Sequence, residues 1–356
     1  MGPIKGSANP VPLGHNPPMQ VQHPTPEPDL FGQACDPERA AARVIPVPFD
    51  ATCSYRKGAA RGPMAIRRAS TQVDLFDLPF GSPWQAGIYM EREAEEIRLL
   101  NREGRALVGE LRSSTNCDRP TTLERLNTIG AEVNRRVATR TAEALETGCL
   151  PVVLGGDHSA PFGSITAVAS AHPGLGLLHI DAHADLRVAY EGLTWSHASI
   201  IHNVLSRVQD VATVLQVGQR DLCAEEWESI ENGAPRLTCL TDWEWSRERL
   251  AGTDLGLRID AALECLPREV YITLDVDGLD PALCPNTGTP VPGGLTWNEV
   301  CLWLERLVAS GRRIVGLDLC EVSPGPTVAD GKDSWDAIVG ARLLYKLIGA
   351  ALRSRE

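Results

Sequence analysis

The chain has 356 residues, of which 43% are hydrophobic, and its formal net charge is −12. This length suits one large α/β domain with an extension. The acidic balance, without a basic cluster, excludes nucleic acid and an anionic membrane surface as expected partners. A small cationic substrate suits this charge.

The cysteines and the apolar runs indicate the compartment. Ten cysteines stand singly, with no Cys-x-x-Cys pair, as in a protein whose thiols stay reduced. No apolar run approaches the ~20 residues that span a bilayer. The N-terminus lacks the basic and apolar regions of a signal peptide. The predicted location is therefore cytoplasmic.

The predicted elements begin after a proline-rich stretch. Residues 1–41 are expected to form an irregular arm, either disordered or laid across a neighbouring subunit, and 42–356 a single domain. Strands are predicted at 43–48, 149–154, 175–179, 214–217, 237–240, 270–274 and 314–319. Helices are predicted at 63–70, from an N-cap at Thr121 or Thr122 to 147, and at 165–170, 198–205, 224–231, 297–310 and 335–352. Loops are expected at 50–62 and 76–87, followed by a polar surface segment.

This alternation of near-continuous apolar strands with helices predicts a mainly parallel sheet covered on both faces. Three of the strands are followed by residues of the types that bind metals. They are His158 after the first, Asp181, His183 and Asp185 after the second, and Asp275 and Asp277 after the third. Because parallel strands end at one edge of the sheet, we expect these six side chains to converge there.

Four carboxylates and two histidines at one edge would repel one another unless cations were bound between them. Two divalent ions with bridging carboxylates resolve this conflict. The oxygen and imidazole donors suit manganese, and they also accept nickel, cobalt or zinc.

These residues lie in motifs that resemble the ureohydrolases, the arginase and agmatinase family. The motifs are Gly155-Gly156-Asp157-His158-Ser159, Asp181-Ala182-His183-Ala184-Asp185, Asp275-Val276-Asp277-Gly278-Leu279-Asp280-Pro281, Gly288-Thr289-Pro290, Gly293-Gly294-Leu295 and Glu321-Val322-Ser323-Pro324. The resemblance covers residues 42–352. It implies a three-layer α/β/α sandwich with a mainly parallel eight-stranded sheet, and a ureohydrolase catalytic domain over 42–356.

The resemblance also implies a role for each residue. One ion would be bound by His158, Asp181, Asp185 and Asp275, and the other by Asp181, His183, Asp275 and Asp277, so that Asp181 and Asp275 bridge. A hydroxide between the ions would attack the guanidinium carbon, releasing urea or a urea analogue and an amine. Asp185 would protonate the leaving amine. Glu321 would receive the guanidinium, and His197 would shuttle protons or line the pocket.

The remaining polar residues near these motifs have structural interpretations. Asp157 is expected either to support the metal ligands from behind or to fix its loop. His179 and His202 are expected to be packing or helix-surface residues, and His15, His23 and His172 to be uninvolved.

The region 192–199 departs from the arginase pattern. It contains Gly-Leu-Thr-Trp-Ser-His-Ala-Ser instead of the arginase Ser-Gly-Asn-Leu-His-Gly block, so arginine is not the expected substrate. Asp185-Leu186-Arg187 with Ser196-His197-Ala198-Ser199 is similar to one branch of agmatinases. Residues 333–336, residues 84–88 and the long arm resemble the branch with nickel-dependent guanidine hydrolases and biguanide-cleaving relatives. Trp195 and Trp335 either narrow the pocket by cation–π contact or simply pack.

The leading hypothesis is a hydrolase with two manganese or nickel ions that acts on guanidine, an alkylguanidine or a biguanide such as metformin. Agmatine, cleaved to putrescine and urea, is the second candidate. A hypothesis of another class is a non-catalytic subunit that partners an active paralogue. A deacetylase-type zinc amidohydrolase is disfavoured by Asp277 and His183 together. The resemblance implies a homo-oligomer, a trimer or hexamer, possibly with a paralogous subunit.

Overall fold

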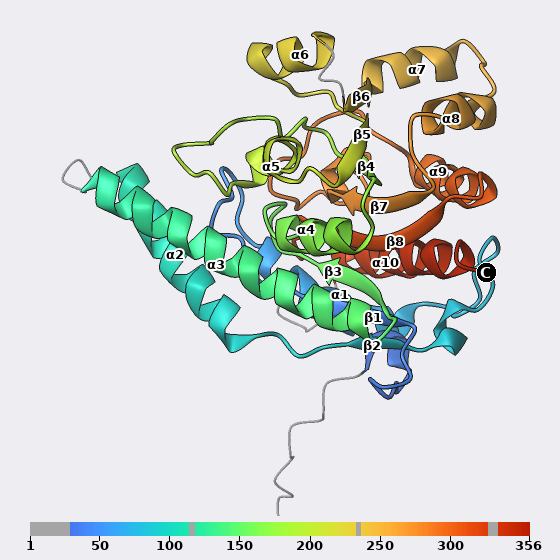
Figure 1. Ribbon diagram of the computed structural model, residues 1–356, viewed down its shortest axis with the longest axis horizontal. Coiled ribbons are helices and arrows are strands. Elements are labelled where there is room, and N and C mark those ends of the chain that lie inside the picture. The colour runs from blue at the N-terminus through green and yellow to red at the C-terminus, as the bar shows by residue number, and fades with distance from the viewer. Residues whose placement is uncertain (1–28, 114–117, 233–235, 327–333) are drawn as a thin grey trace, which may run out of the picture.

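A computed structural model describes residues 29–113, 118–232, 236–326 and 334–356 (Figure 1). Its centre is one sheet made of β1 (Ala42–Pro46), β2 (Ile88–Met90), β3 (Leu150–Leu154), β4 (Leu175–Ile180), β5 (Val211–Val217), β6 (Leu237–Leu240), β7 (Glu269–Leu274) and β8 (Arg313–Leu319). The strand order is β2-β1-β3-β8-β7-β4-β5-β6, and every pairing is parallel. The predicted fold class is confirmed, and the sheet is parallel throughout.

Helices cover both faces of this sheet (Figure 1). One face is covered by α1 (Gly62–Ala69), α8 (Leu255–Leu263), α9 (Trp297–Ala309) and α10 (Trp335–Arg353). The other face is covered by α2 (Glu95–Ser113), α3 (Arg119–Glu146), α4 (Phe162–Ala171) and α5 (Ile200–Arg207). The helices α6 (Ala224–Glu231) and α7 (Asp242–Leu250) lie beyond the β6 edge.

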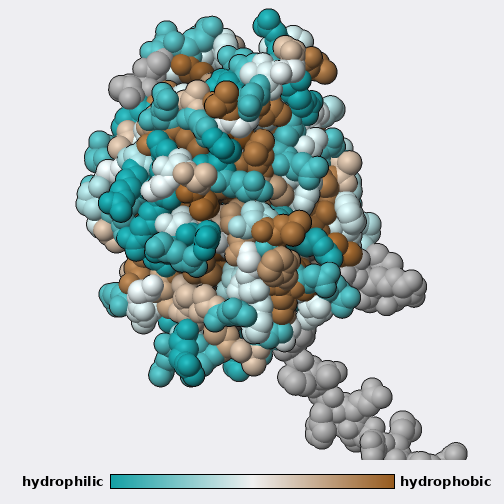
Figure 2. Space-filling view, turned by 90° about the vertical axis from the view of Figure 1, so that its right-hand side faces the viewer, coloured by the Kyte–Doolittle hydropathy of each residue, from teal (hydrophilic) through white to brown (hydrophobic). Residues whose placement is uncertain are grey.

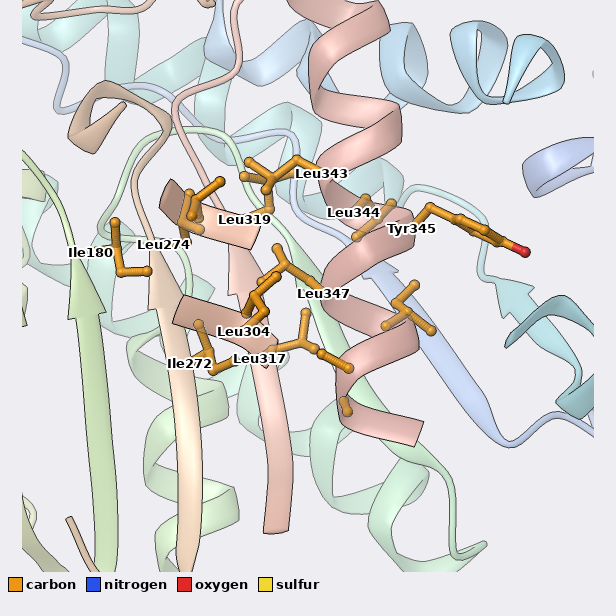
Figure 3. Close-up of a cluster of buried hydrophobic side chains, with 14 of the residues drawn as sticks. Ile180, Ile272, Leu274, Leu304, Leu317, Leu319, Leu343, Leu344, Tyr345 and Leu347 are labelled. Carbon is orange, nitrogen blue, oxygen red and sulfur yellow. The ribbon is translucent and has the colours of Figure 1, made fainter. Parts of the chain in front are cut away.

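Burial on both faces explains why the strands are almost uniformly apolar. Successive side chains of a strand point to opposite faces, so Leu178 joins the core beneath α9 and α10 while Leu177 joins the core beneath α4 and α5. Figure 3 shows Leu343 and Leu347 of α10 beside Leu317 and Leu319 of β8. The hydrophobic cores on the two faces pack against the central strands and so fix the positions of the strand ends.

Several elements were not predicted. The segment expected to be polar surface contains β2 and α2, and α2 buries Ile97 and Val108. The helices α7 and α8 were also missed. The predicted N-cap of α3 was wrong, because Asp118 accepts the hydrogen bond from Thr121 N and Pro120 occupies the first turn.

The described part of the arm, residues 29–41, packs on its own domain, and the expected contact with a neighbouring subunit stays a prediction. Phe31 is buried, its ring centroid lies 4.7 Å from that of Tyr345 in α10, and its N–H donates to Ser70 Oγ at 2.7 Å. Residues 1–28 lie outside the described residues.

The surface shown in Figure 2 has hydrophilic and hydrophobic residues interspersed. Within the described ranges, the structure contains no helix with the length and apolar character needed to cross a membrane.

The close packing of α4 against α3 at Gly163 predicts a stability effect. A Cβ on Gly163 would overlap Asn134 O and lie 2.9 Å from Ala138 N, both backbone atoms of α3. We therefore expect Gly163→Ala to lower the free energy of unfolding by about 1–3 kcal/mol. Gly109 in α2 is the matched control, since a Cβ there meets no atom of the described chain within 4 Å. Gly109→Ala should instead raise it by about 0.5–1 kcal/mol. Denaturant unfolding monitored by circular dichroism would contradict the packing argument if both variants behaved alike.

Candidate metal centre

The candidate site lies at the carboxyl ends of β3, β8, β7 and β4, which are consecutive in the sheet. Asp181 follows β4 directly and Asp275 follows β7 directly. His158 comes four residues after β3, and Glu321 comes two residues after β8. The structure therefore brings the four sequence motifs to one edge, as expected for parallel strands.

The first cluster surrounds the imidazole of His158. Its Nδ1 lies 2.9 Å from Asp181 Oδ2, 3.0 Å from Asp185 Oδ2 and 3.7 Å from Asp275 Oδ2. All four side chains are buried. This is the set of residues expected to bind the first ion.

The second cluster surrounds His183, which is half-buried. Its Nδ1 lies 3.4 Å from Asp181 Oδ1 and 3.2 Å from Asp277 Oδ2. The two oxygens of Asp181 thus face different clusters, as a bridging carboxylate requires. Asp275 is joined to this side by the hydrogen bond from Asp277 N to its Oδ1, at 2.8 Å.

The electrostatics of the clusters fit bound cations. Burial, together with the negative charges of Asp277 and Asp181, raises the pKa of Asp275 well above its usual range. Burial and the charge of Asp181 raise the pKa of Asp185 to about 7. Carboxylates that repel one another in this way are stabilised in their ionised form by divalent cations. Oxygen and imidazole donors in two groups that share Asp181 therefore suit a pair of such ions.

Two of the site carboxylates stand on unusual backbone. Asp185 has φ of 55° and Glu321 has φ of 61°, in the left-handed region that non-glycine residues rarely adopt. Each turn is held by a hydrogen bond across the edge, from His202 N to Asp185 O at 3.0 Å and from Glu321 N to Gly156 O at 2.8 Å. Such strain persists only where the surrounding structure fixes it, and it is concentrated at functional sites.

Glu321 faces the same space as the clusters. Its Oε1 accepts a hydrogen bond from His158 N at 3.0 Å, which fixes the carboxylate against the first cluster. Its Oε2 lies 3.9 Å from the Cys53 thiol, and a Cβ on Gly288 would lie 3.2 Å from the same oxygen. The glycine thus leaves the approach to the carboxylate clear. Cys53 was not predicted as a site residue, because it lies in a loop whose position the sequence does not reveal.

That loop, residues 50–54, also holds the pocket wall. Thr52 Oγ1 donates to Asp157 Oδ2 at 2.8 Å, and Ser159 N donates to Asp157 Oδ1 at 3.2 Å, which supports the loop-fixing role expected for Asp157. Thr52 Oγ1 also lies 3.2 Å from His197 Nδ1. Thr52 therefore connects the loop after β3 to the predicted pocket histidine.

His197 lies in the wall of a pocket of about 250 Å³ that opens over the clusters. The other lining residues are Ser54, His183, Asp185, Arg187, Tyr190, Ala198, Asp221, Leu222, Cys223, Glu226 and Thr289. Burial, followed by the charges of His183 and His158, lowers the pKa of His197 to about 3. The imidazole is therefore neutral at physiological pH.

The expectation for His179 was incomplete. His179 is a buried residue of β4, but its Nε2 lies 2.9 Å from Asp181 Oδ2 and its ring stacks on that of His158 at 5.4 Å. The sequence could have indicated this contact, because side chains two residues apart in a strand point to the same face and His179 is two residues before Asp181. On the other side, His158 Nε2 lies 2.9 Å from Thr273 Oγ1, a contact that sequence analysis also missed.

The two tryptophans proposed for the pocket pack elsewhere. Trp195 contacts Phe162, with ring centroids 5.0 Å apart, and Arg207 lies over its ring. Trp335 is half exposed and donates to Ala282 O. Neither lines this pocket, and the packing interpretation is supported for Trp195, while a pocket role for Trp335 stays a prediction.

Of the other histidines, His172 lies away from the clusters, whereas the backbone N–H of His202 donates to Asp185 O. His172 Nδ1 lies 2.9 Å from Glu269 Oε2 at the opposite end of the strands, and His202 is a half-buried residue of α5. His15 and His23 lie outside the described residues.

A parallel α/β/α sheet with two overlapping His and Asp clusters at one edge is an arrangement that suits a metal-dependent hydrolase. The model of the arginase family matches residues 40–349. The chain is 32% identical to an N(1)-aminopropylagmatine ureohydrolase of Thermus thermophilus, over 90% of this chain and 94% of the relative. It is 31% identical to an agmatinase of Bacillus anthracis, over 81% and 85%.

Among solved structures, the proclavaminate amidino hydrolase of Streptomyces clavuligerus matches with a TM-score of 0.70 and 24% identity, over 92% of this chain and 97% of that one. The chain therefore belongs to the arginase family, the ureohydrolases, whose members act on guanidino groups.

The shared position of Asp181 predicts the effect of Asp181→Asn. We expect the folded variant to retain at most one divalent ion per subunit and to lose most activity, because an amide cannot supply two anionic oxygens. Metal content measured by inductively coupled plasma mass spectrometry, with circular dichroism as the folding check, tests this. Asp210→Asn is the control, since Asp210 is an exposed acid in the turn before β5. Two ions and unchanged turnover in Asp181→Asn would refute the bridging role.

Proposed function

We propose that this protein hydrolyses a C–N bond of a small guanidino compound, with two divalent ions, manganese or nickel, bound by His158, Asp181, His183, Asp185, Asp275 and Asp277. Two bound ions would lower the pKa of water from 15.7 toward about 7 and so supply a hydroxide. The convergence of both histidines on Asp181 is the observation that carries this proposal.

Glu321 is the proposed receptor for the guanidinium group. A planar guanidinium presents paired N–H donors that match the two oxygens of a carboxylate. Glu321 is buried, is fixed by His158 N and faces the cluster edge, so a cation bound to it would hold its carbon beside the ions. The cation would also relieve the repulsion between Glu321 and its buried neighbour Asp157.

Asp185 and His197 are the proposed proton carriers. An amide anion is too basic to leave, so the departing nitrogen must receive a proton. Asp185 lines the pocket and belongs to the first cluster, where it can accept the proton released by the attacking water. His197 lies in the same wall and, being neutral, can pass a proton between the pocket and solvent.

Guanidine, an alkylguanidine or a biguanide is the leading substrate class. The pocket is compact, and Arg187 at its wall would repel a positively charged tail. Arg187 is held in place, because its guanidinium lies over the Tyr190 ring at 5.2 Å and its Nε lies 3.7 Å from Glu226 Oε2.

Agmatine is the second candidate, because two observations favour a cationic tail. Asp221 is exposed at the same pocket, with an oxygen 4.0 Å from His183 Nε2, and could pair with a distal ammonium. The relatives from Thermus and Bacillus are named for aminopropylagmatine and agmatine. The non-catalytic alternative is disfavoured, since the candidate ligands, Glu321 and His197 are all retained. A cytoplasmic location and a trimer or hexamer, with or without a paralogous subunit, stay predictions.

Substitution of the proposed receptor tests the binding mode. Glu321→Gln keeps the shape of the side chain and removes its charge. We expect kcat/KM to fall about 10²- to 10³-fold, since leaving a buried charge without its partner costs about 2–5 kcal/mol. Metal content should be unchanged, which separates loss of substrate binding from loss of ions. An unaltered kcat/KM would exclude Glu321 as the receptor.

The substrate class is tested by a panel comprising guanidine, methylguanidine, metformin, agmatine, 4-guanidinobutyrate and arginine. Urea or ammonia release would be measured for protein loaded with manganese and for protein loaded with nickel. We expect the highest kcat/KM on a compound without a distal ammonium. Agmatine in first place would move the assignment to the second candidate, and Asp221→Asn should then raise KM for agmatine but not for guanidine. Robust arginine cleavage would contradict the pocket argument.

A further inference from the structure

A row of polar side chains crosses the sheet two residues before the candidate ligands Asp181 and Asp275. Gln216 of β5 and Thr273 of β7 are the register partners of His179 in β4. Asp318 continues the row on β8, because Ile272 and Leu317 pair at the preceding position. All four side chains are fully buried in strands that are otherwise apolar. Buried polar groups are costly unless hydrogen-bonded, so the partners of this row indicate its purpose.

The amide of Gln216 has only one sensible orientation. Its Nε2 lies 2.7 Å from Ala184 O, and a carbonyl oxygen can only accept a hydrogen bond, so a nitrogen must stand there. The same nitrogen lies 3.1 Å from His179 Nδ1. The amide therefore donates one hydrogen to Ala184 O, inside the Asp-Ala-His-Ala-Asp motif, and the other to the imidazole.

This orientation fixes the tautomer of His179. Since Nδ1 accepts from the amide, the ring hydrogen of the neutral imidazole must be on Nε2. Nε2 lies 2.9 Å from Asp181 Oδ2, to which it donates. The other oxygen, Oδ1, accepts from His183 N at 2.7 Å. Besides its contact with the His158 or His183 imidazole of the cluster that it faces, each oxygen of Asp181 thus receives one further hydrogen bond, Oδ2 from His179 and Oδ1 from His183 N.

We propose that Gln216 and His179 are positioning residues for the metal centre: a one-way chain of hydrogen bonds, from Gln216 to His179 to Asp181, sets the orientation of the shared carboxylate. This inference rests on the proposed pair of ions. Two residues that follow β5 also hold the backbone of the motif, because Gln219 Nε2 donates to His183 O at 3.3 Å and Arg220 N donates to Ala182 O at 2.7 Å. Three successive carbonyls of the motif are thereby tied to the neighbouring strand end.

The experiment compares two substitutions of His179 in the metal-loaded protein. Glutamine can place an N–H donor near the position of the imidazole Nε2, whereas phenylalanine keeps a ring without a donor. We expect His179→Phe to weaken binding of at least one ion about 10- to 100-fold, the range seen when partners of metal ligands are removed. His179→Gln should recover most of this loss. Metal affinity is measured by competition with a chromogenic chelator, which requires no substrate.

The outcomes separate the inference from the function on which it rests. Wild-type protein that binds no divalent ion would overturn the proposed metal chemistry itself. Tight wild-type binding with equal affinity in a folded His179→Phe would overturn the positioning role alone, as would equal losses in the Phe and Gln variants. If His179→Phe does not fold, Gln216→Met provides the test, since it removes both donors from the amide position. Wild-type affinity in Gln216→Met would then refute the chain of hydrogen bonds.

Discussion

Repulsion between buried carboxylates at one sheet edge is the constraint on which the site depends. Asp181, Asp185, Asp275 and Asp277 approach the same two imidazoles, and such a group cannot remain ionised without compensation. Backbone N–H groups supply part of it, because His183 N donates to Asp181 and Asp277 N donates to Asp275. The remaining negative charge faces the space between the clusters, where cations would balance it. The acidity that would destabilise the metal-free protein would therefore be the source of its proposed affinity for metal ions.

The sheet makes this concentration of charge tolerable by confining it to turns. The strands carry apolar side chains on both faces, while the acids stand just beyond their ends. Neighbouring loops then lock the turns together. Arg220 Nη2 donates to the carbonyls of Asp277 and Val291 at 2.7 and 2.8 Å, and buried Asp50 accepts from Gly58 N at 3.0 Å. A site held by so many loop contacts needs little reorganisation when a ligand arrives.

Sequence analysis located the candidate ligands because each follows an apolar run, and an apolar run that turns polar marks the end of a buried strand. It failed where the local pattern was weak. β2 has only three residues, Ile88–Met90, too few to show a period. The cap of α3 was placed too late because Thr121 and Thr122 are good capping residues, whereas the preceding Asp118 accepts the hydrogen bond. The two possible roles of the tryptophans, in the pocket or in packing, could not be separated, because an aromatic side chain near a site for a cationic ligand is compatible with either.

The contacts behind the ligands could not be derived from any single stretch of sequence. His179 was visible two residues before Asp181, but its partner Gln216 lies 37 residues further along, on a strand whose place beside β4 becomes known only with the sheet order. Thr273 reaches His158 from the opposite side of β4, and β7 lies there because the chain returns to the middle of the sheet after β6. β7 comes late in the sequence but lies in the centre of the sheet, so its side chains are placed beside candidate ligands that follow earlier strands. The order of the strands in the sheet therefore decides which residues orient the candidate metal centre.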